Sequence, residues 1–220
     1  DLHAILHPAK EVGGDLYDFY MDGNHLYFLI GDVSGKGVPA SLFMAITRSL
    51  FRTLSQHVLS PAKIVTEMNN SISDNNESNM FVTLIVGILD LETGILKLCN
   101  AGHNPPILIY PDGQVSYLEF KTQIFVGVVE DFKYSDEEVV LEKESKLFLY
   151  TDGVTEAENI NKELYGEEKL LEMLSDNASS DVRTTVNVVV DSIASHVKEA
   201  EASDDLTILL IQYEPGTANS

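Results

Sequence analysis

Aspartates in short turns recur at four places in the chain, each beside glycine or another small residue at an end of an apolar segment. These turns contain Asp15, Asp32, Asp152 and the pair Asp204-Asp205. A carboxylate at a strand end has a well-anchored backbone, while its side chain can point into a cleft. Carboxylate oxygens suit Mg²⁺ and Mn²⁺, and four converging aspartates repel one another unless cations lie between them. The pattern therefore predicts a two-metal hydrolase.

Each of these turns also has an ordinary structural interpretation. Asp32 begins an Asp-x-Ser-Gly sequence, which is a common turn in which aspartate caps a helix or bonds its own backbone. Asp152 is followed by glycine, another frequent turn pair. In Asp204-Asp205, one carboxylate can cap while the other binds a metal. The single motifs are weak, and the prediction depends on all of them together.

Composition excludes several other classes of protein. The single cysteine, Cys99, leaves no partner for an internal disulfide and no thiolate cluster for zinc. The 35 acidic against 14 basic residues give a formal charge of −21, which disfavours binding to nucleic acid or to anionic membranes. No apolar run reaches the roughly 18–20 residues that span a bilayer. The start, Asp1 to Ala4, has neither an initiator Met nor a signal-peptide pattern, so we expect a cytoplasmic domain of a longer protein.

The first half of the chain predicts a hairpin followed by two helices. Asp22-Gly23 between apolar runs indicates a hairpin over about 15–30. Pro39 opens a helix, and Ser60 caps a second one that runs to about Ser73. In the first helix, apolar and small residues at helical spacing predict one buried stripe, made of Leu42, Ala45, Ile46, Ser49, Leu50 and Leu54.

The second half predicts mainly strands, then two more helices. Residues 81–89, 96–100, 106–110 and 115–120 indicate an antiparallel meander, and 134–141 with 146–150 indicate a further strand pair. Helices are expected over about 166–176 and 181–199, and a last strand over 206–213. Successive strands with paired helices predict an α+β fold of layered antiparallel sheets covered by helices, rather than alternating βαβ units.

Five ordered motifs resemble those of the bacterial PPM (2C-type) serine/threonine phosphatases, in the branch of stage II sporulation protein E and the sigma-regulator phosphatases. The resemblance extends from about Ala9 to Tyr213. It implies an αββα sandwich of two stacked antiparallel sheets flanked by helix pairs, with residues 1–220 as one phosphatase domain. The motifs are Gly13-Gly14-Asp15-Leu16-Tyr17-Asp18, Gly31-Asp32-Val33-Ser34-Gly35-Lys36-Gly37, Asn100-Ala101-Gly102-His103-Asn104-Pro105-Pro106, Tyr150-Thr151-Asp152-Gly153-Val154-Thr155-Glu156-Ala157 and Asp204-Asp205-Leu206-Thr207.

The resemblance also implies roles for individual residues around two Mn²⁺ or Mg²⁺ ions. Asp32 would bridge both ions and position the attacking water, and the carbonyl of Val33 would complete one coordination sphere. Asp15 would bind one ion. The other ion would be held by Asp152 and Asp204, with Asp205 as the alternative at that position. Asp18, either a ligand or a solvent-facing strand residue, would support a weaker third ion.

The implied activity is metal-dependent hydrolysis of phosphoserine or phosphothreonine on a regulatory protein by an activated water. The implied substrate is a phosphorylated anti-sigma-factor antagonist, and the implied upstream partner is a sensory or receiver domain. Eukaryotic members carry His after the Asp-Gly of the bridging aspartate, where this chain has Val33-Ser34. The general acid is therefore open, either a water at the metals or His103, whose ordinary role is to shape its turn.

Two other functions are compatible with the sequence. The chain could be a catalytically idle relative that docks partner proteins, although all four ligand positions are Asp. It could also hydrolyse small phosphorylated metabolites. No arginine is identified as a phosphate ligand, because Arg48, Arg52 and Arg183 all lie in predicted helices.

Overall fold

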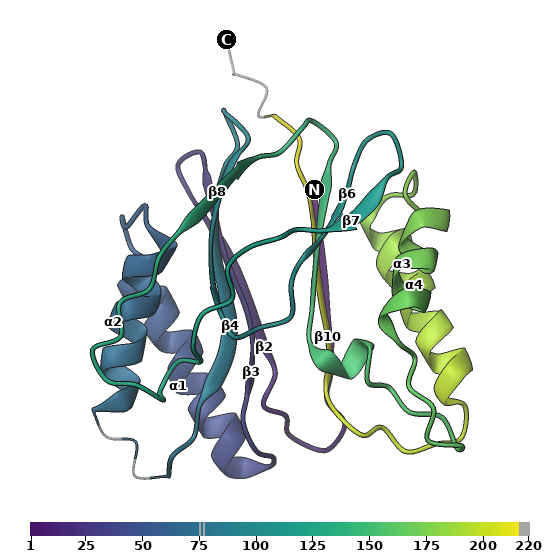
Figure 1. Cartoon of the computed structure of the whole chain (residues 1–220), viewed down its shortest axis with the longest axis horizontal. Coiled ribbons are helices and arrows are strands. Elements are labelled where there is room, and N and C mark those ends of the chain that lie inside the picture. Colours follow the sequence, from purple (N-terminus) through teal and green to yellow (C-terminus); the bar gives the residue numbers. More distant parts are fainter. Residues whose placement is uncertain (75, 77, 216–220) are drawn as a thin grey trace. The chain divides into compact units, whose positions relative to one another are not determined.

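The chain forms two compact units, each assembled from segments that are far apart in the sequence. A computed structural model describes residues 1–74, 76 and 78–215. The central unit contains residues 12–103 and 119–141, and the terminal unit contains residues 1–11, 104–118 and 142–214. Each unit has one five-stranded antiparallel sheet and one pair of α-helices (Figure 1).

The sheet of the central unit has the order β2-β3-β4-β5-β8. Its strands are β2 (Leu16–Asp22), β3 (His25–Val33), β4 (Val82–Asp90), β5 (Ile95–Ala101) and β8 (Glu137–Val140). Helices α1 (Val38–Leu54) and α2 (Pro61–Ser73) pack on one face of this sheet. As predicted, Ser60 caps α2, since its side chain accepts a hydrogen bond from the backbone N–H of Lys63.

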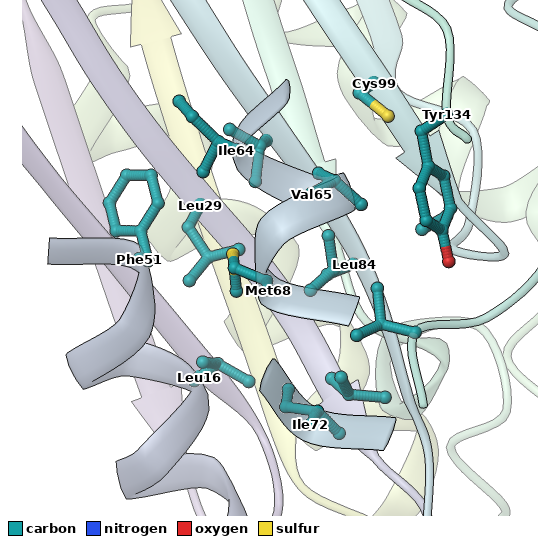
Figure 2. Packing of buried hydrophobic residues seen from close by; sticks show 14 of the residues in the cluster. Leu16, Leu29, Phe51, Ile64, Val65, Met68, Ile72, Leu84, Cys99 and Tyr134 are labelled. Carbon is teal, nitrogen blue, oxygen red and sulfur yellow. The ribbon is translucent and has the colours of Figure 1, made fainter. Parts of the chain in front are cut away.

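The core of the central unit lies between these two helices and the sheet. Figure 2 shows Phe51 of α1 and Met68 of α2 in one cluster with strand residues such as Leu84. Prolines in the first turn suit both helix starts, because that position has no intrahelical partner for an N–H.

The predicted buried stripe of α1 is confirmed only at Leu50 and Leu54, which pack against the core, and was wrong for its other members. Leu42 and Ile46 are 62% and 55% exposed. The fully buried positions of α1 are Ala40, Thr47 and Phe51. Thr47 is accommodated because its hydroxyl donates to the carbonyl of Phe43 at 2.8 Å, so a polar residue occupies a position that periodicity alone assigns to an apolar one.

The sheet of the terminal unit has the order β1-β10-β9-β6-β7. Its strands are β1 (Leu2–His7), β6 (Ile107–Ile109), β7 (Val115–Tyr117), β9 (Lys146–Tyr150) and β10 (Leu206–Gln212). Helices α3 (Glu167–Asp176) and α4 (Val182–Val197) cover one face, and a 3₁₀ turn, η1 (Asp152–Val154), follows β9. Both helices lie close to their predicted ranges.

The α+β class and its two antiparallel sheets with paired helices are confirmed, but two predictions about strand neighbours were wrong and one strand was not predicted. The meander does not continue past β5, because β6 and β7 join the other sheet. The expected pair 134–141 and 146–150 does not form, since β8 pairs with β5 and β9 pairs with β10 and β6. Strand β1 was missed; it pairs with β10, about 200 residues away in the sequence.

None of the helices within residues 1–74, 76 and 78–215 combines the length with the apolar composition that a membrane-crossing helix needs.

Candidate metal centre

Asp15 and Asp32 lie at neighbouring strand ends in the central unit. Leu16 pairs with Gly31, so continuing this antiparallel register by one residue brings Asp15 opposite Asp32. Residues directly opposite one another on adjacent strands share a face of the sheet. The close packing requires glycine nearby, because a Cβ on Gly14 would lie 2.9 Å from the carbonyl oxygen of Val33. The structure thus brings this predicted pair together.

The loop after Asp32 is fixed to strand β4. Asp32 pairs in register with Thr83, and the Thr83 hydroxyl lies 3.5 Å from the Asp32 carbonyl oxygen. Ser34 forms two hydrogen bonds with the backbone of Phe81, one donated by its N–H and one accepted by its hydroxyl, both 2.9 Å long. These contacts hold the Asp32-Val33 backbone in place, and sequence patterns gave no signal for Thr83.

Asp18 has a different environment from Asp15 and Asp32. It pairs with Leu29, which belongs to the helix-covered core, so Asp18 faces the helices, whereas Asp32, three residues from Leu29, faces the other side of the sheet. Asp18 is 4% exposed and forms ion pairs with Arg48 at 3.1 Å and Arg52 at 2.5 Å.

These ion pairs decide the charge state of Asp18. Burial by itself raises the pKa of Asp18, but the hydrogen bonds and positive charges of Arg52 and Arg48 outweigh it and hold the pKa below its usual value. Both arginines therefore have a structural partner in the central unit. The role of Asp18 at a third ion stays a prediction, beside the structural role that these contacts support.

His103 is held in a buried turn of the central unit. The side chain of Asn100 accepts a hydrogen bond from the His103 N–H at 2.8 Å and donates one to its carbonyl at 3.0 Å. The ring Nδ1 lies 2.9 Å from the hydroxyl of Thr83, the residue opposite Asp32. His103 is 3% exposed. This arrangement supports the structural interpretation of His103, as a support for the strand next to Asp32.

Asp152 and Asp204 lie at neighbouring strand ends in the terminal unit. The backbone N–H of Thr151 donates to the carbonyl of Thr207, and the N–H of Thr207 donates to the Thr151 hydroxyl, both at 3.1 Å. A Cβ on Gly153 would lie only 1.9 Å from the carbonyl oxygen of Asp205. Only glycine permits this approach, so the two acidic turns are in direct backbone contact.

The structure separates the roles of Asp204 and Asp205. A carboxylate oxygen of Asp205 accepts a hydrogen bond from the backbone N–H of Ala9 at 2.8 Å, and Asp205 is 7% exposed. Asp205 thereby ties the segment after β1 to the turn before β10. Asp204 is more exposed, and its carboxylate accepts from the N–H of Asp205 at 2.9 Å. These contacts favour Asp204 as the candidate ligand.

The donors fit hard divalent cations, since all are carboxylate or carbonyl oxygens. Within residues 1–74, 76 and 78–215, no group of three or more His, Cys, Asp or Glu side chains is arranged to hold a metal ion. The structure therefore provides two aspartate pairs, one in each unit, and the four-aspartate metal site stays a prediction.

Comparison with known proteins identifies the family. The family model for stage II sporulation protein E (SpoIIE) matches residues 22–214. The chain belongs to this family, as the sequence motifs predicted.

The chain is similar to phosphoserine phosphatase RsbU of Bacillus subtilis strain 168, with 27% identity over 213 residues, 96% of the chain and 63% of RsbU. It is also 27% identical over 238 residues to protein IcfG of Synechocystis, covering 96% of the chain and 37% of IcfG. The solved SiaA-PP2C domain of Pseudomonas aeruginosa superposes with a TM-score of 0.87 at 22% identity, over 97% of this chain and 86% of that one. The chain thus spans less than two thirds of the length of the two curated relatives, RsbU and IcfG.

Proposed function

We propose that this chain is a Mn²⁺- or Mg²⁺-dependent protein phosphatase that hydrolyses phosphoserine or phosphothreonine. One observation carries the proposal: two aspartate pairs, Asp15 with Asp32 and Asp152 with Asp204, each lie at neighbouring strand ends in a chain of the SpoIIE family. Two ions held by all four aspartates would neutralise their charges. Residues 1–220 would then act as one phosphatase domain.

Asp32 has the central role in this proposal. Its carboxylate would bridge the two ions and position the attacking water, and the Val33 carbonyl would add a further oxygen ligand. Such ions, when bound, lower the pKa of a water and neutralise phosphoryl oxygens. The chain itself contributes rigidity: Ser34 and Thr83 hold the Asp32-Val33 backbone, and a fixed ligand geometry loses no binding energy to reorganisation.

The substrate and partners are proposed from the family. The substrate would be a phosphorylated anti-sigma-factor antagonist, so dephosphorylation would change which partner that protein binds. By resemblance to the family, a sensory or receiver domain would regulate the phosphatase. With such a substrate, the domain would act in the cytoplasm of a bacterial cell, in signal transduction to a sigma factor.

A phosphate-release assay tests this function. A phosphoserine protein of the antagonist class is incubated with the purified chain, with Mn²⁺ in one arm and with EDTA in the other. We expect release only with Mn²⁺ and little release from nucleotides or sugar phosphates. Binding of the phosphoprotein without hydrolysis would indicate an idle docking module instead. Faster hydrolysis of the small phosphates would indicate a metabolite phosphohydrolase.

A further inference from the structure

A cavity of about 210 Å³ opens in the terminal unit beside Asp204. One wall is formed by apolar residues of α4, Val190, Ile193 and Val197. Ala157 and Leu206 extend the apolar lining, and the segment 201–204 forms another side. Concave sites with an apolar lining and a few converging polar groups are the usual form of a binding pocket.

Three of the side chains that line the cavity are acidic, and His7 is the one basic side chain among the described lining residues. The lining includes the carboxylates of Glu158, Glu201 and Asp204, and no Lys or Arg stands among the described residues that line the cavity. Glu158 already pairs with Lys162 at 2.7 Å. Glu201, which is exposed at the rim, is therefore the carboxylate best placed to receive an additional cation.

The cavity also adjoins the proposed site of reaction. Asp204 and Gly153 line the cavity, and Asp204 is a proposed metal ligand in the turn that contacts Gly153. An extended peptide advances about 3.3–3.6 Å per residue. If the phosphorylated residue of a substrate binds near Asp204, a substrate side chain within about three residues of the phosphorylated residue would therefore lie at the cavity.

We infer that this cavity is a specificity pocket for a lysine or arginine side chain of the phosphoprotein substrate, within about three residues of the phosphorylated residue. The aliphatic stem of such a side chain packs on apolar surface while its charged head stays near solvent and carboxylates, which matches α4 on one side and Glu201 at the rim. This inference rests on the proposed function and adds a sequence preference to it.

Peptides that differ at one position test the pocket. Phosphoserine peptides would carry Lys, norleucine or Glu at each position from three before to three after the phosphoserine. For at least one position we expect kcat/KM with Lys to exceed that with norleucine by about twofold to fivefold, the size of an exposed ion pair. Glu at that position should give the lowest value, since it meets carboxylates.

Matched variants locate the preference in the molecule. Ala194 lines the cavity, whereas its neighbour Ser195, which is also exposed on α4, does not. Ala194→Leu should reduce the Lys preference to less than twofold, and Ser195→Leu should keep it. Glu201→Gln should weaken the preference for Lys over norleucine, while Glu199→Gln, also exposed and outside the cavity, should not.

Binding without catalysis separates this inference from the proposed function. The same peptides, labelled with a fluorophore, are titrated with the protein in EDTA and followed by anisotropy. If the protein hydrolyses no phosphopeptide and no small aryl phosphate, the proposed function fails, and the anisotropy series still decides whether the pocket prefers Lys. An absent Lys preference in both assays, or an equal preference in Ala194→Leu and Ser195→Leu, overturns the inference.

Discussion

Two arginines of α1 stabilise the charged form of Asp18. Arg52 donates to both of its carboxylate oxygens and Arg48 donates to one. The carboxylate is buried and the arginines are half exposed. The ion pairs between them join the outer strand β2 to α1. Removing the Asp18 carboxylate would leave the positive charges of both arginines without this partner.

Asp18→Asn should therefore lower the free energy of unfolding by about 1–2 kcal/mol at pH 7. The pKa of Asp18 is lowered in the folded protein, so the stability that it contributes is present above its unfolded pKa of about 3.9 and is lost as the pH falls through the lowered folded value. Urea unfolding of both proteins between pH 7 and pH 3 measures this. The difference between them should shrink only below about pH 4.

Asp22→Asn is the matched control on the same strand. Asp22 pairs with His57 at an exposed position, and we expect its loss to change stability by less than about 0.5 kcal/mol. Equal effects of the two substitutions would contradict the structural role of Asp18. A Mn²⁺ titration of activity in Asp18→Asn tests the third ion separately, because a ligand role predicts a change at high Mn²⁺ concentration.

The turn after β9 and the turn before β10 depend on each other. Gly153 has no room for a side chain, since an added Cβ would lie 1.9 Å from the Asp205 carbonyl oxygen, a backbone atom. A methyl group there must push the two turns apart, and Asp152 and Asp204 would separate with them.

Gly153→Ala should lower stability by about 1–3 kcal/mol, as overpacking does, and should also reduce the rise in melting temperature that Mn²⁺ produces. Differential scanning fluorimetry with and without Mn²⁺ measures both effects. Gly113→Ala is the control: its added Cβ meets nothing closer than 3.9 Å, although its φ of +89° makes alanine strained. We expect Gly113→Ala to lower stability and to keep the full Mn²⁺ effect; a full effect in Gly153→Ala as well would count against the account.

Local sequence patterns predicted the helices and strands better than they predicted which strands pair with each other. The β2-β3 hairpin follows from Asp22-Gly23, and α2 follows from Ser60-Pro61, because turn and cap preferences act within a few residues. The crossing from β5 to β6 and the pairing of β1 with β10 depend on contacts between distant segments, which periodicity does not encode.

The candidate site shows the same division. The sequence placed each aspartate at a strand end, and the structure agrees for Asp15, Asp32, Asp152 and Asp204. The hydrogen-bond and ion-pair partners of the nearby residues Asp205 and Asp18 were not predicted. The hydrogen bond from Ala9 to Asp205 forms only when β1 is paired with β10. The ion pairs between α1 and Asp18 form only when α1 packs on the sheet.

The excess of acidic residues in the chain makes cation binding a source of stability. The chain carries a formal charge of −21, and self-repulsion of like charges destabilises a compact state. An ion that binds the folded chain but not the unfolded one stabilises it by about 2.7 kcal/mol at a concentration one hundred times its Kd.

Mn²⁺ should therefore raise the melting temperature of the wild-type protein, and EDTA should reverse the rise. Thermal melts over a Mn²⁺ series at constant ionic strength measure this, with Ca²⁺ or added NaCl at matched ionic strength as controls for general screening. Equal shifts with NaCl and with Mn²⁺ would show that the effect is screening and would count against a specific site.

In the proposed mechanism, Asp32 bridges metal ions that are required for hydrolysis. The most direct measurement is Mn²⁺-dependent phosphate release from a phosphoserine protein by wild type and by Asp32→Ala, with circular dichroism to check that both are folded. We predict that Asp32→Ala loses at least about a hundredfold in kcat, as removal of one electrostatic catalytic group does, while it keeps its fold. Substantial Mn²⁺-dependent release by a folded Asp32→Ala protein would contradict the claim.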